Sequence, residues 1–246
     1  MGTVLLCAAG VGLATVAGSV LSFFVKEIPH KINDAILSFA AGIMLGATFF
    51  SLILPAFTYS ANSVWPCIAG IAAGAVIVKL MSRFVPQLHQ LLYSAKQSNP
   101  KIDRVMLFLI AIAIHNLPEG MAVGVSFGSG DTSNAFSIAI GIALQNIPEG
   151  MITILPLLLA GVSRKRAFLA ALFTGLTEVA GTLFGYIAIT LASAILPFVL
   201  ALAGGTMLFV ISHDMIPETH SHGFEDMATY ALTGGLIVMM LIQHFV

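Results

Sequence analysis

The sequence predicts an all-α membrane protein in which eight transmembrane helices form a single domain over residues 1–246. Composition is the first observation, because 58% of the residues are hydrophobic, only 9% are charged and the mean hydropathy is +1.00. A soluble protein could not cover its surface with so few charges. The second observation is that apolar runs long enough to cross a bilayer recur along nearly the whole chain. Both observations indicate a helix bundle in lipid.

Eight such runs can be delimited, each long enough to span the hydrocarbon core. They are expected at about residues 3–25, 34–54, 62–82, 105–127, 135–160, 167–191, 196–216 and 226–245. The N-terminal segment lacks the positively charged start of a signal peptide, so we expect the first span to remain in the protein. The stretch at about 83–103 is polar, and we expect it to be a cytoplasmic connector rather than a domain. Two lone cysteines predict neither a disulfide framework nor a thiolate metal site.

The lysines and arginines predict the orientation of these spans, because cytoplasmic loops are enriched in both residues. All ten fall at one face of the eight-span arrangement: Lys26, Lys31, Lys79, Arg83, Lys96, Lys101, Arg104, Arg164, Lys165 and Arg166. The loops at the opposite face contain one acid, Asp131, and no basic residue. We therefore expect both termini outside.

A polar heptapeptide occurs twice within apolar sequence. Residues 115–121 read His-Asn-Leu-Pro-Glu-Gly-Met, and residues 145–151 read Gln-Asn-Ile-Pro-Glu-Gly-Met. Helix positions i, i+1 and i+4 lie within about 100° of each other, so each copy presents a carboxylate beside neutral polar groups. Glu119, Glu149 and Glu178 are all expected within about one turn of the bilayer centre, with no Lys or Arg at that depth. The pattern predicts a cation site at the midplane.

The residue types in this site narrow the choice of cation. The candidate ligands are His115, Asn116, Glu119, Gln145, Asn146, Glu149 and Glu178. An imidazole with carboxylates and amide oxygens suits zinc, iron(II), manganese or cobalt, and disfavours copper(I), calcium and magnesium. Structural alternatives remain open: Glu178 as a protonated acid between small residues, His115 as a buried histidine bonded to a carbonyl, and the asparagines as interhelical hydrogen-bond donors.

The two copies of the motif also predict the topology. They lie on consecutive spans that cross in opposite directions, yet both read in the same sequence direction. Such copies are related by a pseudo-two-fold axis in the membrane plane, as in inverted-repeat transporters with a midplane site. Residues 42–45 (Gly-Ile-Met-Leu) and 205–208 (Gly-Thr-Met-Leu) repeat the relation weakly between the second and seventh spans. We expect a 3+2+3 inverted-repeat bundle.

The paired motifs, His115-Asn-x-Pro-Glu119-Gly and Gln145-Asn-x-Pro-Glu149-Gly, resemble those of the ZIP (ZRT/IRT-like) family of divalent-metal transporters, in particular its GufA-like bacterial branch. The resemblance implies that the seven residues form a binuclear transport site in which the two motif glutamates bridge the metals. It implies import of zinc, or of iron, manganese, cobalt or cadmium, by alternating access. It also implies a homodimer in the bacterial inner membrane, with lipid and metal ions as partners and no prosthetic group. Many members have histidine where Gln145 stands and an acid where Asn146 stands.

The last cytoplasmic connection is crowded with polar side chains, and the resemblance places its start near the cytoplasmic exit. Candidate exit residues are His213, Asp214, His220 and His222, although an ordinary solvated loop is an equal alternative. Two other functions remain open for the whole chain. One is a proton-coupled carrier of an organic solute. The other is an intramembrane metal-dependent hydrolase, which the missing HExxH motif disfavours. The sequence has no nucleotide-binding motif, and we expect no nucleic-acid partner.

Overall fold

The computed structural model describes residues 1–246 except 25–28, 61–62, 94–115, 160 and 192. The described residues are helical almost throughout, and none of them is in a β-strand. Within these ranges six helical stretches are long and apolar enough to cross a membrane: Gly2–Phe24, His30–Tyr59, Val64–Met81, Arg164–Leu191, Leu196–Thr219 and Glu225–Phe245. The two segments with the paired motif are not among these six. The predicted all-α class is confirmed for the described part of the chain.

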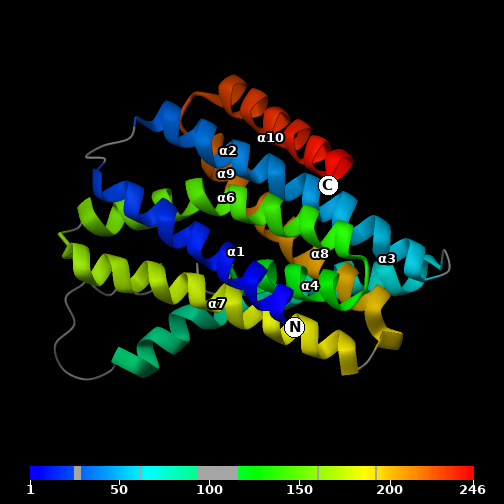
Figure 1. Ribbon diagram of the computed structural model, residues 1–246. Helices are drawn as coiled ribbons and strands as arrows, with labels where there is room; N and C mark the ends of the chain where they lie inside the picture. The colour runs from blue at the N-terminus through cyan, green and yellow to red at the C-terminus, as the bar shows by residue number, and fades with distance from the viewer. Residues whose placement is uncertain (25–28, 61–62, 94–115, 160, 192) are drawn as a thin grey trace.

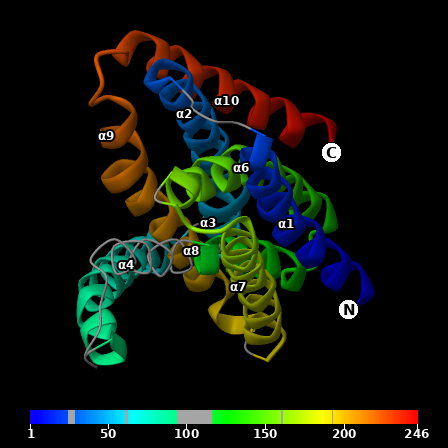
Figure 2. The same ribbon diagram turned by 90° about the vertical axis from the view of Figure 1, so that its left-hand side faces the viewer.

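The helices run back and forth along one bundle axis, with both termini at the same end (Figure 1). In chain order they are α1 (Gly2–Leu21), α2 (His30–Gly46), α3 (Leu54–Tyr59), α4 (Val64–Tyr93), α6 (Thr132–Leu159), α7 (Arg164–Leu191), α8 (Leu196–Val210), α9 (Ile216–Thr219) and α10 (Glu225–Phe245). Residues 116–128 are also helical and contain most of the first motif copy. Short 3₁₀ turns, Ser22–Phe24 and Ser193–Ile195, follow α1 and precede α8. In Figure 2, α10 lies along α2, α4 crosses beside α8, and α1 lies against α6 and α7.

Several helices extend beyond the expected spans, and two of them do so by more than three residues at an end. The continuous helical stretch His30–Tyr59 begins before residue 34 and ends after residue 54. Helix α4 continues to Tyr93, so the first part of the expected connector is helical. Residues 87–93 contain neither Gly nor Pro and are rich in Leu and Gln, which favour helix. Polarity alone therefore placed the end of this helix too early.

A local irregularity occurs at two places with the same order of elements. Helix α2 passes through a π-helical segment, Ala47–Ile53, into α3, and α8 passes through a π-helical segment, Ile211–Met215, into α9. Pro55 and Pro217 stand at the start of the helix that follows. A proline has no N–H for the carbonyl four residues back, which favours a shift in hydrogen-bond register. Accordingly, the N–H of the residue before each proline bonds to the carbonyl five residues back.

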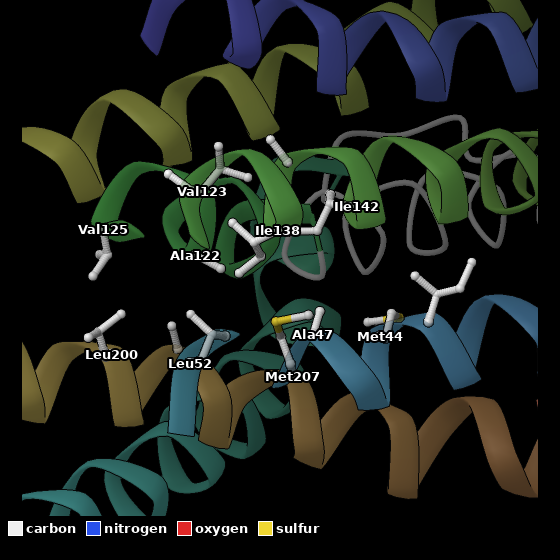
Figure 3. Close-up of a cluster of buried hydrophobic side chains, with 14 of the residues drawn as sticks. Met44, Ala47, Leu52, Ala122, Val123, Val125, Ile138, Ile142, Leu200 and Met207 are labelled. Atoms are coloured by element: carbon white, nitrogen blue, oxygen red, sulfur yellow. The ribbon is translucent and has the colours of Figure 1, made fainter. Parts of the chain in front are cut away.

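An apolar core packs the two motif segments against α2 and α8. Figure 3 shows side chains from residues 116–128 and from α6 facing side chains from α2, its π-helical extension and α8. Each of the labelled side chains is at most 1% exposed: Met44, Ala47, Leu52, Ala122, Val123, Val125, Ile138, Ile142, Leu200 and Met207. Because Ala122 and Ile142 each lie three residues from a motif side chain, Glu119 and Gln145 respectively, this packing also positions the polar site.

Candidate functional site

The side chain of Glu178 on α7 is fully buried where several helices cross. Its Oε1 accepts hydrogen bonds from Thr15 Oγ1 on α1 and from Asn116 Nδ2, each at 2.6 Å. Its Oε2 accepts a hydrogen bond from Asn146 Nδ2 on α6, also at 2.6 Å. Three hydrogen-bond donors from three different segments therefore surround this one carboxyl group. The structure thus brings the two motif asparagines onto one carboxylate.

A second contact joins the two motif copies directly. Gln145 Nε2 donates a hydrogen bond to Glu119 Oε1 at 2.9 Å, and both side chains are buried. The carboxyl groups of Glu119 and Glu149 also lie within electrostatic range of Glu178. Six of the seven predicted site residues therefore lie in one cluster. The seventh, His115, is outside the described residues.

Two amide oxygens of this cluster are buried without a donor. Asn116 Oδ1 and Gln145 Oε1 accept no hydrogen bond from any described residue. A buried acceptor left unsatisfied costs about 1–3 kcal/mol, so such atoms call for a compensating partner. The amide nitrogens of the same two side chains donate to Glu178 and Glu119. The amide oxygens, which are potential metal ligands, therefore lie close to carboxyl groups. This combination suits a divalent cation. Over the described ranges, no three His, Cys, Asp or Glu side chains are arranged as a metal cluster.

Glycines allow the backbones around this cluster to approach closely. An added Cβ on Gly120 would collide with the carbonyl oxygen of Glu178, and one on Gly150 with the carbonyl oxygen of Thr15. Gly120 and Gly150 end the Pro-Glu-Gly triplets of the two motif copies. Each motif glycine is therefore required by close packing, one against α7 and the other against α1.

Comparison with known proteins identifies the family. The family model described as "ZIP Zinc transporter" matches residues 89–243. The zinc transporter GufA of Myxococcus xanthus is 36% identical over 99% of this chain and 98% of its own length. The zinc transporter ZIPB of Bordetella bronchiseptica is 37% identical over 94% of this chain and 77% of its own, and the zinc transporter ZIP11 of Xenopus tropicalis is 32% identical over 93% of each. The chain belongs to the ZIP zinc transporter family. The predicted resemblance is confirmed.

Membership of the ZIP family settles the broad class of the protein. ZIP proteins are carriers in membranes, so this chain is an integral, multi-pass membrane protein and not an enzyme. The intramembrane hydrolase is thereby excluded as an alternative. The candidate site lies within the part of the chain that the family model covers, except for the contact from Thr15.

The predicted exit residues of this ZIP protein do not gather at one point. His213 Nδ1 and Asp214 Oδ1 are 2.7 Å apart on the π-helical segment after α8, and both side chains are more than half exposed. His220 Nδ1 lies 2.9 Å from the carbonyl oxygen of Ile216. His222 Nδ1 lies 3.1 Å from Asp34 Oδ1, and its ring stacks on that of His30. These residues form separate groups because the helical segment and the turn after α9 direct them apart.

Two residues in these contacts were missed from the sequence. Asp34, near the start of α2, is fully buried, although it is the first residue of an expected span, where a solvated acid is ordinary. Thr15 was also missed, although a sequence signal exists for it. Residues 12–18 read Gly-Leu-Ala-Thr-Val-Ala-Gly and residues 175–181 read Gly-Leu-Thr-Glu-Val-Ala-Gly, which aligns Thr15 with Glu178.

Proposed function

We propose that this ZIP family member imports divalent transition metal ions into the cytoplasm, with zinc as the principal substrate and iron, manganese, cobalt or cadmium as further candidates. One observation carries the proposal: amide groups from both motif copies donate to the buried Glu178, and two amide oxygens beside them accept no hydrogen bond from any described residue. Relatives at 30–37% identity are named zinc transporters, which supports zinc. The proposed transporter is a single domain over residues 1–246.

The proposed substrate site is binuclear. Its ligands are His115, Asn116, Glu119, Gln145, Asn146, Glu149 and Glu178, and Glu119 and Glu149 bridge the two metals. Carboxylates that converge in a medium of low dielectric repel one another, and a dication between them removes that cost. Asn116 can keep its hydrogen bond to Glu178 through Nδ2 and offer the unsatisfied Oδ1 to a metal ion. The polar network is then an assembly of ligands that is held together before the ion arrives.

The proposed transport mechanism is alternating access in an eight-span, 3+2+3 inverted-repeat bundle. It is supported by the paired motifs and by the matching order of helix, π-helical segment and proline in α2–α3 and α8–α9. Both termini are proposed to lie outside, because the ten basic residues then face the cytoplasm. The inner-membrane location and the homodimer follow from the family resemblance.

Zinc binding and zinc uptake by the purified, reconstituted chain test this proposal. Elemental analysis should find two zinc ions per unmodified chain, and vesicles containing the protein should take up zinc. Glu119→Gln and Glu149→Gln each remove a bridging carboxylate, so each should lose both ions and nearly all uptake. Asp131→Asn is the matched control, because Asp131 is an exposed acid in the loop before α6. It should change neither quantity.

The possible outcomes separate the parts of the proposal. Two zinc ions retained by Glu119→Gln or Glu149→Gln would refute the bridging role. If the unmodified protein binds no divalent metal at all, metal transport is refuted, and the carrier of an organic solute becomes the better hypothesis.

A further inference from the structure

The hydroxyl group of Thr15 makes an unusual contact for a threonine in an apolar helix. Such hydroxyls commonly bond to a carbonyl of their own helix, as Thr174 does with Ala171 and Thr182 does with Glu178. Thr15 is 2% exposed and instead donates to the Glu178 carboxylate, 163 residues away, at 2.6 Å. The other described donors at Glu178, Asn116 and Asn146, are predicted metal ligands, whereas Thr15 is not.

Thr15 and Glu178 occupy equivalent places in the two halves of the chain. Residues 12–18 on α1 and 175–181 on α7 have the same sequence except at two positions, one of which pairs Thr15 with Glu178. The first glycines of these segments, Gly12 and Gly175, face each other, and a Cβ on either would lie 2.5 Å from the carbonyl oxygen of the other. The crossing of α1 and α7 is therefore symmetric in its backbone.

The packing of the motif helices follows the same symmetry. The backbone of residue 15 packs on the glycine of the second motif copy, and the backbone of residue 178 packs on the glycine of the first. Three residues further along α1 and along α7 the same arrangement repeats, because a glycine of each helix packs on a carbonyl group of a motif copy. The contacts are Gly150 with Thr15, Gly120 with Glu178, Gly18 with Ile147 and Gly181 with Leu117. The two halves thus present one backbone frame with a hydroxyl at one position and a carboxylate at its equivalent.

We propose that Thr15 is a positioning residue for metal binding by Glu178, an inference that rests on the proposed function. Thr15 and Asn116 both donate to Oε1, whereas Oε2 is held by the amide of Asn146 among the described donors. Thr15 therefore fixes the orientation of the Glu178 carboxylate by holding Oε1. Oε2 is then the oxygen that can release the hydrogen bond from Asn146 and bind a metal ion. A hydroxyl does this without adding charge. A second glutamate at this position would place two carboxylates in direct contact.

Variants of Thr15 test the inference in the full-length protein. Thr15→Val keeps the shape of the side chain and removes the donor, and Thr15→Ser restores the donor. Loss of a hydrogen-bond partner of a metal ligand typically costs about 10- to 100-fold in affinity, so Thr15→Val should raise the Kd for Zn²⁺ and the KM of uptake by about that factor. The visible absorption of bound Co²⁺ should change in Thr15→Val and not in Thr15→Ser. Thr174→Val, which removes a buried hydroxyl bonded to its own helix, should leave all three readouts unchanged.

The results distinguish this inference from the proposed function. Zinc binding by the unmodified protein together with an unchanged Kd in Thr15→Val would overturn the role of Thr15 alone. So would a Thr15→Ser protein as weak as Thr15→Val. A failure of the unmodified protein to bind Zn²⁺ or Co²⁺ would overturn both proposals. Thr15→Ala, which is smaller, provides the same comparison if the valine variant does not fold.

Discussion

Replacing Asn146 by aspartate turns a hydrogen bond in the site into a repulsion. Asn146 Nδ2 donates to Glu178 Oε2 at 2.6 Å, and both side chains are buried. In Asn146→Asp an oxygen replaces the donor, and a hydrogen bond to a charged group worth about 1.5–3 kcal/mol is lost. Two carboxylates about 4 Å apart at an effective dielectric constant of about 20 also repel by about 4 kcal/mol. We expect the zinc-free variant to be less stable by up to about 4 kcal/mol, because uptake of a proton by one of the two acids limits the cost.

Zinc should reverse this effect. A dication between the two carboxylates removes their repulsion, and the relieved energy adds to the binding free energy. Since 1.4 kcal/mol corresponds to a factor of ten, about 4 kcal/mol sets an upper limit of roughly a thousandfold gain in zinc affinity. The assay is thermal unfolding in detergent with and without zinc, together with a competition titration for Kd. Zinc should raise the unfolding midpoint of Asn146→Asp by more than it raises that of the unmodified protein.

A second buried asparagine on the same helix provides the control. Asn134 Nδ2 donates to the carbonyl oxygen of Ser51 at 3.0 Å, which is a backbone group and not a carboxylate. Asn134→Asp should lower stability, and zinc should not restore it. If Asn146→Asp binds zinc no more tightly than the unmodified chain, the argument that residue 146 and Glu178 meet at the metal is wrong.

Three further predictions concern the affinity, the topology and the exit. Gln145→His should strengthen zinc binding, measured by calorimetry, because imidazole is a better zinc ligand than an amide oxygen; weaker binding would contradict a ligand role for residue 145. A cysteine at Asn62 should react with an impermeant thiol reagent applied to intact cells and one at Gln97 should not, because the distribution of basic residues predicts a cytoplasmic position for residue 97. The reverse labelling would overturn the topology. Changing His213, His220 and His222 together to alanine should slow uptake and leave the metal content of the proposed midplane site unchanged, as checked by elemental analysis. Loss of that metal would place the primary site among these histidines.

The polar cluster around Glu178 was predictable because its sequence signal is duplicated. Two copies of one polar motif, expected at the same depth in apolar helices, can satisfy their polar groups only against each other or against a third polar residue. The hydrogen bonds from Asn116 and Asn146 to Glu178, and from Gln145 to Glu119, agree with that expectation. The all-α class was predictable for the same reason as in other membrane proteins, since a backbone in lipid must satisfy its own hydrogen bonds.

Proximity in sequence was a poor guide to the contacts of the predicted exit residues. His213 and His222 are close along the chain, but a π-helical segment and the turn after α9 separate the contacts that they make. His222 instead pairs with Asp34 at the start of the second helical stretch, a contact across 188 residues. Composition cannot predict such a pair, because each partner alone has the character of a solvated residue near a membrane surface.

The pairing of Thr15 with Glu178 shows how a duplicated frame can carry an unequal site. Glycines at equivalent positions fix the backbones of α1 and α7, so a change of side chain at residue 15 or 178 need not disturb the packing of the helices. The same holds for residues 115 and 145, where one motif copy has histidine and the other glutamine. In the proposed site, the donors around the two metals then differ while the scaffold remains symmetric. Since each 1.4 kcal/mol changes an affinity tenfold, one weak donor in place of a strong one is enough to make one metal leave more readily than the other. A carrier must release its ion as well as bind it. Different side chains at equivalent positions of the two halves would allow one metal to leave more readily, while the glycine packing that holds the helices together stays the same.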